Sequence, residues 1–278
     1  MRTEPSSRRL LQRVMPGALF AALTLWAVPA TAQLADVEDT STIIEDAEAM
    51  SADEGAAVDP WEGFNRRIFA FNNAVDEVFL VPAAQLYRAV TFNKQRRGIR
   101  NFLDNLRTPQ ILLNDILQGE FKRARNTASR FVINSTVGFG GMGDPAERIG
   151  IAQHSEDFGQ TLAVWGAPAG PYLVIPIFGP STIRDGIGAA GGVAMDPAVW
   201  LRTDAAALFR YTRAGVTGVA VREPLIEPLE EIKANSLDQY ASFRSFYLQA
   251  RKREIQNGRT DFEDLPDIGD FDEFEDLE

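Results

Sequence analysis

Apolar residues recur every three or four positions in several segments of the chain, a spacing typical of amphipathic helices. The first such set comprises Phe64, Ile68, Phe71, Val75 and Phe79. Asp59 and Pro60 stand before it, where an N-cap and the first helical residue are expected. Pro82 predicts that this helix ends or kinks there, because proline lacks the N–H donor that a helix interior needs.

Four further amphipathic helices are predicted, over residues 99–106, 111–117, 121–132 and 229–247. The first of them is expected to stop before Pro109. The last is expected to be one long helix after Pro228. It ends in the basic run 251–253, where cations complement the helix dipole.

Residues 138–192 lack this periodicity and are rich in glycine and proline. The short β-like run Tyr172–Ile175 predicts at most a small hairpin there, with loops around it. We therefore expect a mainly α protein with a single folded domain over residues 59–253.

The two ends of the chain differ from this body in composition. Residues 1–32 combine four arginines, an apolar stretch and the small residues Ala30 and Ala32, the pattern of a cleavable signal peptide. An uncleaved N-terminal anchor is the alternative. Residues 33–58 are acidic and lack aromatics, which predicts a disordered acidic linker, and residues 254–278 are predicted to be a disordered acidic tail.

Charge and residue types exclude several kinds of chemistry. The net charge of −11 arises at the ends, since residues 61–260 hold 24 basic and 19 acidic side chains. The 278 residues contain no cysteine and a single histidine, His154. Disulfides, thiolate metal sites, cysteine nucleophiles and zinc sites with several imidazoles are thereby excluded. We expect neither a metal nor a cofactor.

The segment from Lys94 to Arg130 is strongly basic, with nine cationic side chains against three acidic ones, and phenylalanines are interleaved with them. In a cytoplasmic protein this pattern would suggest RNA. Because the chain is expected to be exported, we expect no nucleic-acid partner and favour phospholipid head groups as the anions, with helices lying at the membrane interface. Burial of large apolar side chains, about 1.5–3 kcal/mol each, would dominate such binding. A solvated face of an ordinary helical bundle is the alternative.

Two short motifs have the form of catalytic or nucleotide-binding sequences. Residues 138–143 match G-x-G-x-x-G, but Pro145 and Gly150 leave no room for the helix and second strand of a dinucleotide-binding unit. We interpret this segment as a turn where the backbone bends or approaches another group closely. His154-Ser155-Glu156-Asp157 places a histidine, a hydroxyl and two acids in sequence, yet adjacency alone does not build a catalytic triad.

Several segments, read in order, resemble the MlaA family, also called VacJ. They are Asp59–Arg66, Phe71–Asn73, Asn101–Leu106, Asn114–Gly119, Phe131–Gly138, Glu156–Leu162, Gly170–Tyr172, Ile175–Pro176 and Gly179–Asp185. Each motif alone is modest, whereas the ordered series is highly specific. The similarity covers about residues 59–250.

The resemblance implies a mainly helical, ring-like protein seated in the inner, periplasmic leaflet of the Gram-negative outer membrane. Family members pass mislocalised phospholipids from the outer leaflet to a soluble periplasmic carrier, commonly associate with trimeric porins and carry out no covalent chemistry. Many are lipoproteins that begin at an acylated cysteine. Since this sequence has no cysteine, we expect it not to be lipidated and to be held by interfacial helices, a partner or an uncleaved signal.

A phospholipid conduit needs a polar lane for the head group while the acyl chains stay in hydrocarbon. The candidates for that lane are Asn65, Arg66, Asn72, Asn73 and Arg184. Alternatively the asparagines cap turns, and Arg184 forms an internal ion pair with Asp185. The candidates for a flexible loop at the opening are Gly138, Gly140, Gly141 and Gly143. The candidates for membrane contact are Trp61, Phe64, Phe102 and Phe121.

Three functions remain open from the residues. A membrane-seated phospholipid channel predicts apolar helix faces that are turned outward around a polar passage. A soluble periplasmic lipid-binding protein predicts the same faces closed around a cavity. A lipid hydrolase predicts a catalytic arrangement around His154.

Overall fold

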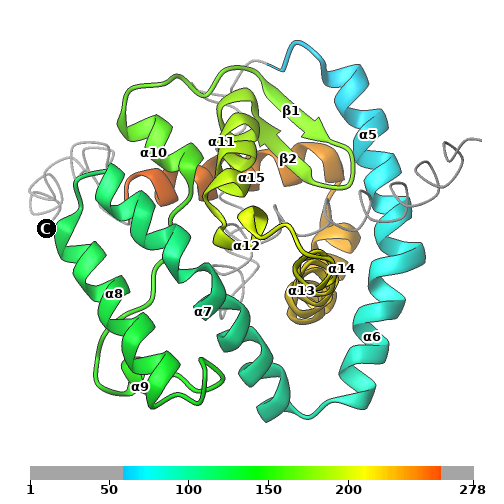
Figure 1. Ribbon diagram of the computed structural model, residues 1–278. Helices are drawn as coiled ribbons and strands as arrows, with labels where there is room; N and C mark the ends of the chain where they lie inside the picture. Colours follow the sequence, from blue (N-terminus) through cyan, green and yellow to red (C-terminus); the bar gives the residue numbers. More distant parts are fainter. Residues whose placement is uncertain (1–58, 258–278) are drawn as a thin grey trace, which may run out of the picture.

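The computed structural model describes residues 59–257, which form a mainly helical domain with one small antiparallel sheet (Figure 1). The helices are α5 (Glu62–Val75), α6 (Val81–Val90), α7 (Asn93–Leu117), α8 (Phe121–Thr136), α9 (Pro145–Arg148), α10 (Phe158–Val164), α11 (Ile183–Met195), α12 (Pro197–Trp200), α13 (Asp204–Arg222), α14 (Ile226–Asn235) and α15 (Gln239–Ile255). Strands β1 (Tyr172–Ile175) and β2 (Gly179–Thr182) form a hairpin. The predicted mainly α fold with a small hairpin is confirmed. The predicted signal peptide 1–32 and linker 33–58 lie outside the described residues, as does the predicted tail 254–278 beyond residue 257. Helix α15 continues to Ile255, so the first residues of the predicted tail belong to the folded domain.

The first apolar stripe forms one nearly continuous rod made of α5, a π-helical turn over Asp76–Leu80, and α6 (Figure 1). The rod begins at Glu62 rather than at Pro60. Pro82 lies in the first turn of α6, where the missing N–H is tolerated. The predicted interruption is therefore a π turn that ends two residues before the proline.

Helix α7 continues through Pro109, so the predicted stop before this residue is wrong. Because proline has no N–H, the carbonyl oxygen four residues before Pro109 has no backbone donor. The carbonyl oxygen of the residue before that one, Asp104, accepts from Thr108 Oγ1 at 3.2 Å. Gln110 Nε2 donates to the Gly192 carbonyl oxygen of α11 at 3.0 Å. Packing against α8, α10, α11 and α13 stabilises this helix along its length and outweighs the local cost of the proline.

The prediction of loops around a hairpin over 138–192 is only partly right, because α10 and α11 also lie there. Helix α11 is rich in glycine, which disfavours helix in an isolated segment. The reason is packing between helices: a Cβ on Gly188 would overlap the backbone of Gly159, and one on Gly191 would overlap the Phe158 ring. These glycines let α11 and α10 approach closely.

The long helix predicted over 229–247 is two helices, α14 and α15. The chain is extended at Ser236, and the Asp238 carboxylate then caps α15 by accepting from Ala241 N at 3.2 Å. An aspartate at this position favours a new helix start over a continuous helix.

The elements are arranged around α13, which Figure 1 views along its axis, with α6 on one side, α7 on the other and the hairpin above it in this view. Helix α13 packs against both α6 and α7. The buried apolar core is small and lies where β1, α5 and α15 meet, with Tyr172, Val174 and Tyr240 at its centre. Within residues 59–257, no helix has the length and hydropathy needed to cross a membrane.

Candidate functional site

The distribution of polar and apolar side chains is opposite to that of an ordinary soluble domain. Of the ten largest fully buried side chains in the described part of the chain, eight are polar, and the other two are Tyr172 and Val174. The eight are Gln160, Glu156, Asn65, Asn114, Thr161, Thr182, Asp115 and Ser181. Because buried polar groups must be hydrogen-bonded, the interior contains a network of specific polar contacts beside the small apolar core.

Large apolar side chains are correspondingly exposed, and we call the following residues the outer apolar set. They are Phe64, Phe71, Val78, Phe79, Leu86, Val90, Phe92, Val132, Val137, Phe139, Met142, Ile149, Trp200, Leu201 and Leu208. Phe79 is 67% exposed and Phe139 is 87% exposed. So many exposed large apolar side chains are unusual for a domain that is surrounded by water alone.

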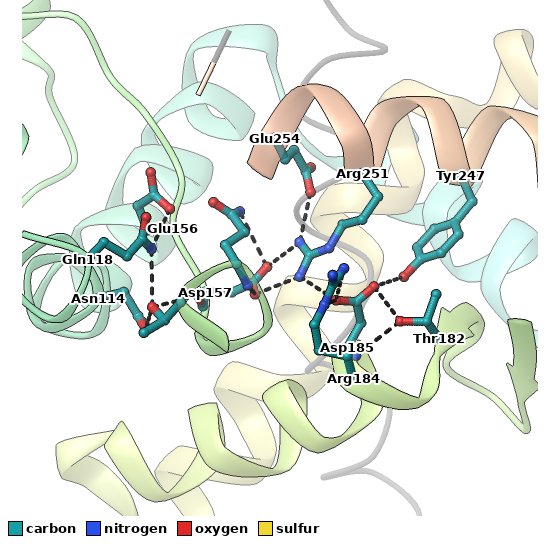
Figure 2. Close-up of polar contacts among 12 residues, drawn as sticks. Asn114, Gln118, Glu156, Asp157, Thr182, Arg184, Asp185, Tyr247, Arg251 and Glu254 are labelled. Atoms are coloured by element: carbon teal, nitrogen blue, oxygen red, sulfur yellow. Dashed lines mark hydrogen bonds and ion pairs between the residues drawn. The ribbon is translucent and has the colours of Figure 1, made fainter. Parts of the chain in front are cut away.

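The centre of the interior is an ion network that joins α10, α11 and α15 (Figure 2). Arg251 donates to both carboxylate oxygens of Asp157 at 2.6 and 2.8 Å, and to Asp185 Oδ1 at 3.0 Å. Despite burial, this guanidinium holds the pKa of both carboxyls below the usual range. Both acids are therefore ionised, and a single arginine connects three helices.

Neighbouring side chains complete this ion network. Tyr247 Oη and Thr182 Oγ1 donate to Asp185 Oδ2 at 2.7 and 2.8 Å (Figure 2). Glu254 Oε2 accepts from Arg251 Nη1 at 2.9 Å, whereas its buried Oε1 has no partner in the described part of the chain. Burial raises the pKa of Glu254 to about 7. This carboxyl thus changes its charge near neutral pH.

A second polar cluster connects α7 and α8 to the segment before α10. Glu156 accepts from Arg123 Nη2 at 2.5 Å and from Gln118 Nε2 at 2.9 Å. Asp115 accepts from Thr127 Oγ1 at 2.6 Å and lies 2.9 Å from His154 Nε2. Asp115, His154 and Glu156 bring three potential metal-ligand atoms within 4.8 Å of one another. Arg123 and the hydrogen-bond donors already compensate these carboxylates, so the set does not fit a cation.

The arrangement around His154 does not form a catalytic triad. In a triad the acid and the hydroxyl contact opposite nitrogens of the imidazole. Here Asp115 Oδ1 and Thr127 Oγ1 both lie next to Nε2, at 2.9 and 3.2 Å. His154 instead lines a polar pocket of about 30 Å³, together with Asn105, Arg130 and Asp144, which is room for a water molecule.

Two residues predicted for the head-group lane are buried and fully bonded. Asn65 is 0% exposed; its Nδ2 donates to Asp59 Oδ1 and to the Tyr172 carbonyl, while its Oδ1 accepts from Val174 N. Arg184 is 9% exposed and pairs with Asp185 at 3.0 Å. Both side chains contact other residues of the protein. For Arg184 the internal ion pair named as the alternative is what the structure contains.

The other three lane candidates lie along α5. Arg66 pairs with Glu62 at 2.7 Å and with Asp238 at 2.6 Å, and its guanidinium lies over the Tyr240 ring. Asn72 bonds to the hairpin. Asn73 is half-buried, and its side chain is the one of the five that makes no hydrogen bond within the described range.

The glycine motif at 138–143 packs against α7 rather than around a nucleotide. Gly141 has φ +92°, and a Cβ there would lie 2.6 Å from Cβ of Asn105. A Cβ on Gly138 would overlap the carbonyl oxygens of Asn134 and Gly143. Gly140 also has a positive φ, but it faces open space. The close approach expected for this segment is therefore present at Gly138 and Gly141.

The membrane-contact candidates and the basic segment are distributed unevenly. Trp61, Phe64 and Phe121 are exposed, whereas Phe102 is half-buried. Of the nine cations between residues 94 and 130, four turn to interior partners: Arg96, Arg100, Arg123 and Arg130. Lys94, Arg97, Lys122 and Arg125 are exposed. Less than half of the basic segment therefore faces the surroundings.

The ion network was not predicted from the sequence, although its members lie in recognisable places. Asp157 is the N-cap of α10 and Asp185 lies in the first turn of α11, positions that favour acids. Arg251 belongs to the basic run that was interpreted only as dipole compensation. The sequence contains an arginine and two acids at helix ends, but no feature of the sequence indicates that these three residues form ion pairs with one another.

Comparisons with known proteins agree with this geometry. The family described as MlaA lipoprotein matches residues 57–254. The Escherichia coli (strain K12) protein named intermembrane phospholipid transport system lipoprotein MlaA is 31% identical over 225 residues, which cover 78% of this chain and 86% of that protein. A protein of Rickettsia bellii (strain RML369-C) is 34% identical over 199 residues, covering 71% of this chain and 77% of the relative.

A solved structure described as "Structural basis for maintenance of bacterial outer membrane lipid asymmetry" is also similar. It superimposes with a TM-score of 0.62 and 31% identity, covering 73% of this chain and all of that chain. The family match, the relatives and the fold lead to one conclusion: this chain belongs to the MlaA family.

Proposed function

We propose that this protein moves mislocalised phospholipids out of the outer leaflet of the Gram-negative outer membrane, and so maintains lipid asymmetry. The observation that carries the proposal is the reversed polarity of the domain. The outer apolar set lies on the exterior, and the fully buried side chains are mostly polar. Relatives named for intermembrane phospholipid transport and a similar structure described in terms of lipid asymmetry support it.

The reversed polarity is compatible with both parts of a phospholipid, the acyl chains and the head group. Each large apolar side chain moved from water into hydrocarbon contributes roughly 1.5–3 kcal/mol, so the outer apolar set holds the domain in one leaflet without a spanning helix. A charged head group left unpaired in hydrocarbon would cost far more than that. A lane for the head group through the domain must therefore be polar.

Further parts of the proposal concern place and partners. We place the protein at the periplasmic face of the outer membrane, in the inner leaflet, with phospholipid as its cargo. A trimeric porin and a soluble periplasmic carrier are its proposed protein partners. Asn73 and the exposed Trp61, Phe64 and Phe121 remain proposed contacts to lipid. No covalent step is required for this activity.

The alternatives fit the geometry less well. A soluble lipid-binding protein would turn its apolar side chains toward a closed cavity, whereas here they are exposed. A hydrolase needs a base and a nucleophile placed across the His154 ring, whereas both partners of His154 lie at one nitrogen.

A clean deletion strain tests the proposal. We expect phospholipid to accumulate in the outer leaflet, the complemented protein to fractionate with the outer membrane, and a His154→Ala variant to restore asymmetry. Normal asymmetry in the deletion strain would contradict the proposed transport. Loss of phospholipid cleavage in the His154→Ala variant would revive the hydrolase.

A further inference from the structure

Arg107 is a half-buried arginine without a protein partner in the described part of the chain. The other arginines that reach the interior are bonded, as Arg222 is to Asp76 at 2.7 Å and Arg251 is to Asp157 at 2.6 Å. Arg107 makes no hydrogen bond and no ion pair with any residue between 59 and 257. A guanidinium carries five N–H donors, and those of Arg107 are left for a group other than the described part of the chain.

The surroundings of Arg107 place it between four helices. The charges that act on it belong to Asp104 of α7, Asp157 at the start of α10, Arg213 of α13 and Glu254 of α15. Burial lowers the pKa of Arg107, although part of its surface remains accessible. An accessible group that is nevertheless surrounded by protein lines an internal space rather than the outer surface.

The neighbouring acids are already engaged elsewhere. Asp157 accepts two hydrogen bonds from Arg251, and Glu254 accepts one at 2.9 Å. The Asp104 carboxylate accepts from Gln153 Nε2 at 3.3 Å. These carboxylates lie within electrostatic range of Arg107, but none of them forms an ion pair with it.

Arg213 adds a second incompletely paired cation on the facing helix. Its Nη1 donates to Asp196 Oδ2 at 2.7 Å, and its other nitrogens have no acceptor within the described range. Its positive charge acts unfavourably on Arg107. Two like charges that act on each other are relieved by an anion placed between them.

We propose that Arg107 and Arg213 bind the phosphate of a phospholipid head group as it passes between α7 and α13. A guanidinium binds phosphate with paired, charge-assisted hydrogen bonds, and two guanidiniums from facing helices match the unesterified oxygens of a phosphodiester. Because the outer apolar set suits contact with a membrane, we take the phosphate to belong to a membrane lipid rather than to a free phosphate ion. This inference rests on the proposed function and adds a specific head-group site to it.

The unbound site carries an electrostatic cost. Because burial disfavours the charged form of Arg107, an uncharged replacement is not expected to destabilise the empty protein. This property separates a ligand-binding arginine from a structural one such as Arg251, whose removal would leave two acids uncompensated.

The test measures binding by the purified full-length chain in detergent micelles. Native mass spectrometry compares phosphatidylglycerol with a diacylglycerol that has the same acyl chains but no phosphate. The variants are Arg107→Gln, Arg107→Lys and Arg213→Gln. Arg253→Gln is the matched control, since Arg253 is an exposed arginine of α15 without a partner in the described range. Thermal unfolding monitors folding.

We expect Arg107→Gln to weaken phosphatidylglycerol binding roughly ten- to hundredfold, with diacylglycerol binding and the unfolding midpoint unchanged. Arg107→Lys should retain an intermediate affinity, because it keeps the charge but not the paired donors. Arg213→Gln should lower the preference for phosphatidylglycerol, and Arg253→Gln should resemble the wild type.

Three results would overturn the inference. They are unchanged phosphatidylglycerol binding by Arg107→Gln, an equal loss for both lipids, and inorganic phosphate that binds the wild type through Arg107 as tightly as the lipid does. Failure of the proposed function has a different signature, since the deletion strain would then keep normal lipid asymmetry whatever Arg107 binds.

Discussion

The Asn72 side chain holds Ile177 in a left-handed backbone conformation at the turn of the hairpin. Asn72 Oδ1 accepts from Ile177 N at 2.6 Å, and its Nδ2 donates to the Ile175 carbonyl oxygen at 3.0 Å. Ile177 has φ +70°, which is costly for a β-branched residue. One amide of α5 therefore fixes the turn between β1 and β2.

Asn72→Leu is expected to destabilise the domain by about 2–3 kcal/mol, because two backbone groups of the turn lose their partners. Asn73→Leu is the matched control, since Asn73 has no hydrogen bond within the described range, and it should change stability by less than about 0.5 kcal/mol. Urea unfolding in detergent measures both variants. Equal effects would contradict the role assigned to Asn72.

Glycine-to-alanine changes in two helices should have opposite effects. Gly188→Ala is expected to cost about 1–3 kcal/mol, because the new Cβ overlaps the Gly159 backbone, which cannot move away as a flexible side chain does. Gly63→Ala in α5 meets no atom within 4 Å and should stabilise by about 0.5–1 kcal/mol. The order of the two unfolding midpoints checks the packing of α11 on α10.

Glu254 should make the stability depend on pH near neutrality. Its pKa is about 7 in the folded protein and near 4.5 in the unfolded chain, so the folded state binds more protons between these values. The contribution of Glu254 to the unfolding free energy therefore falls as the pH rises from about 4.5 to about 7. Glu254→Gln stays neutral and should exceed the wild type by about 1–3 kcal/mol at pH 8, but not at pH 4.5.

Glu231→Gln is the control for this titration, since Glu231 is exposed and has no ion pair within the described range. Urea unfolding at pH 4.5, 6, 7 and 8 measures the difference between each variant and the wild type. A difference for Glu254→Gln that does not change with pH would contradict the raised pKa.

Phe79 tests the membrane-facing surface. Phe79→Asp should leave the fold intact, because this side chain is 67% exposed, and should lower binding to phospholipid vesicles roughly tenfold or more. Phe79→Leu keeps an apolar side chain and should bind nearly as the wild type does. Vesicle sedimentation at high salt provides the measurement, because salt removes purely electrostatic attachment.

The elements that could be predicted from the sequence are those with a periodicity of apolar side chains within the element itself, whether the apolar face is buried or exposed. The stripe from Phe64 to Phe79 and the run Tyr172–Ile175 belong to this class. Helix α11 could not be predicted in this way, because the residue that explains Gly188 is Gly159 on another helix. Pro109 is a similar case, since packing on both sides keeps α7 intact.

The interior network was less predictable than the fold for the same reason. Asp157, Asp185 and Arg251 lie far apart in the chain, and only the folded arrangement places one guanidinium between two carboxylates. The sequence predicts the asparagines of α5 as candidates for the head-group lane, with turn capping as the alternative. Their hydrogen bonds to the hairpin give Asn65 and Asn72 a structural role that the helical spacing does not reveal.

The π turn over Asp76–Leu80 also affects how this segment can change in length. A π turn amounts to one residue inserted into an α-helix, so the helix on either side keeps the phase of an uninterrupted one. Deleting a single residue such as Val78 would convert the turn into α-helix and leave both flanking helices facing as before. A deletion elsewhere in the rod would rotate every later side chain by about 100°. Length variation between relatives is therefore best tolerated at this turn.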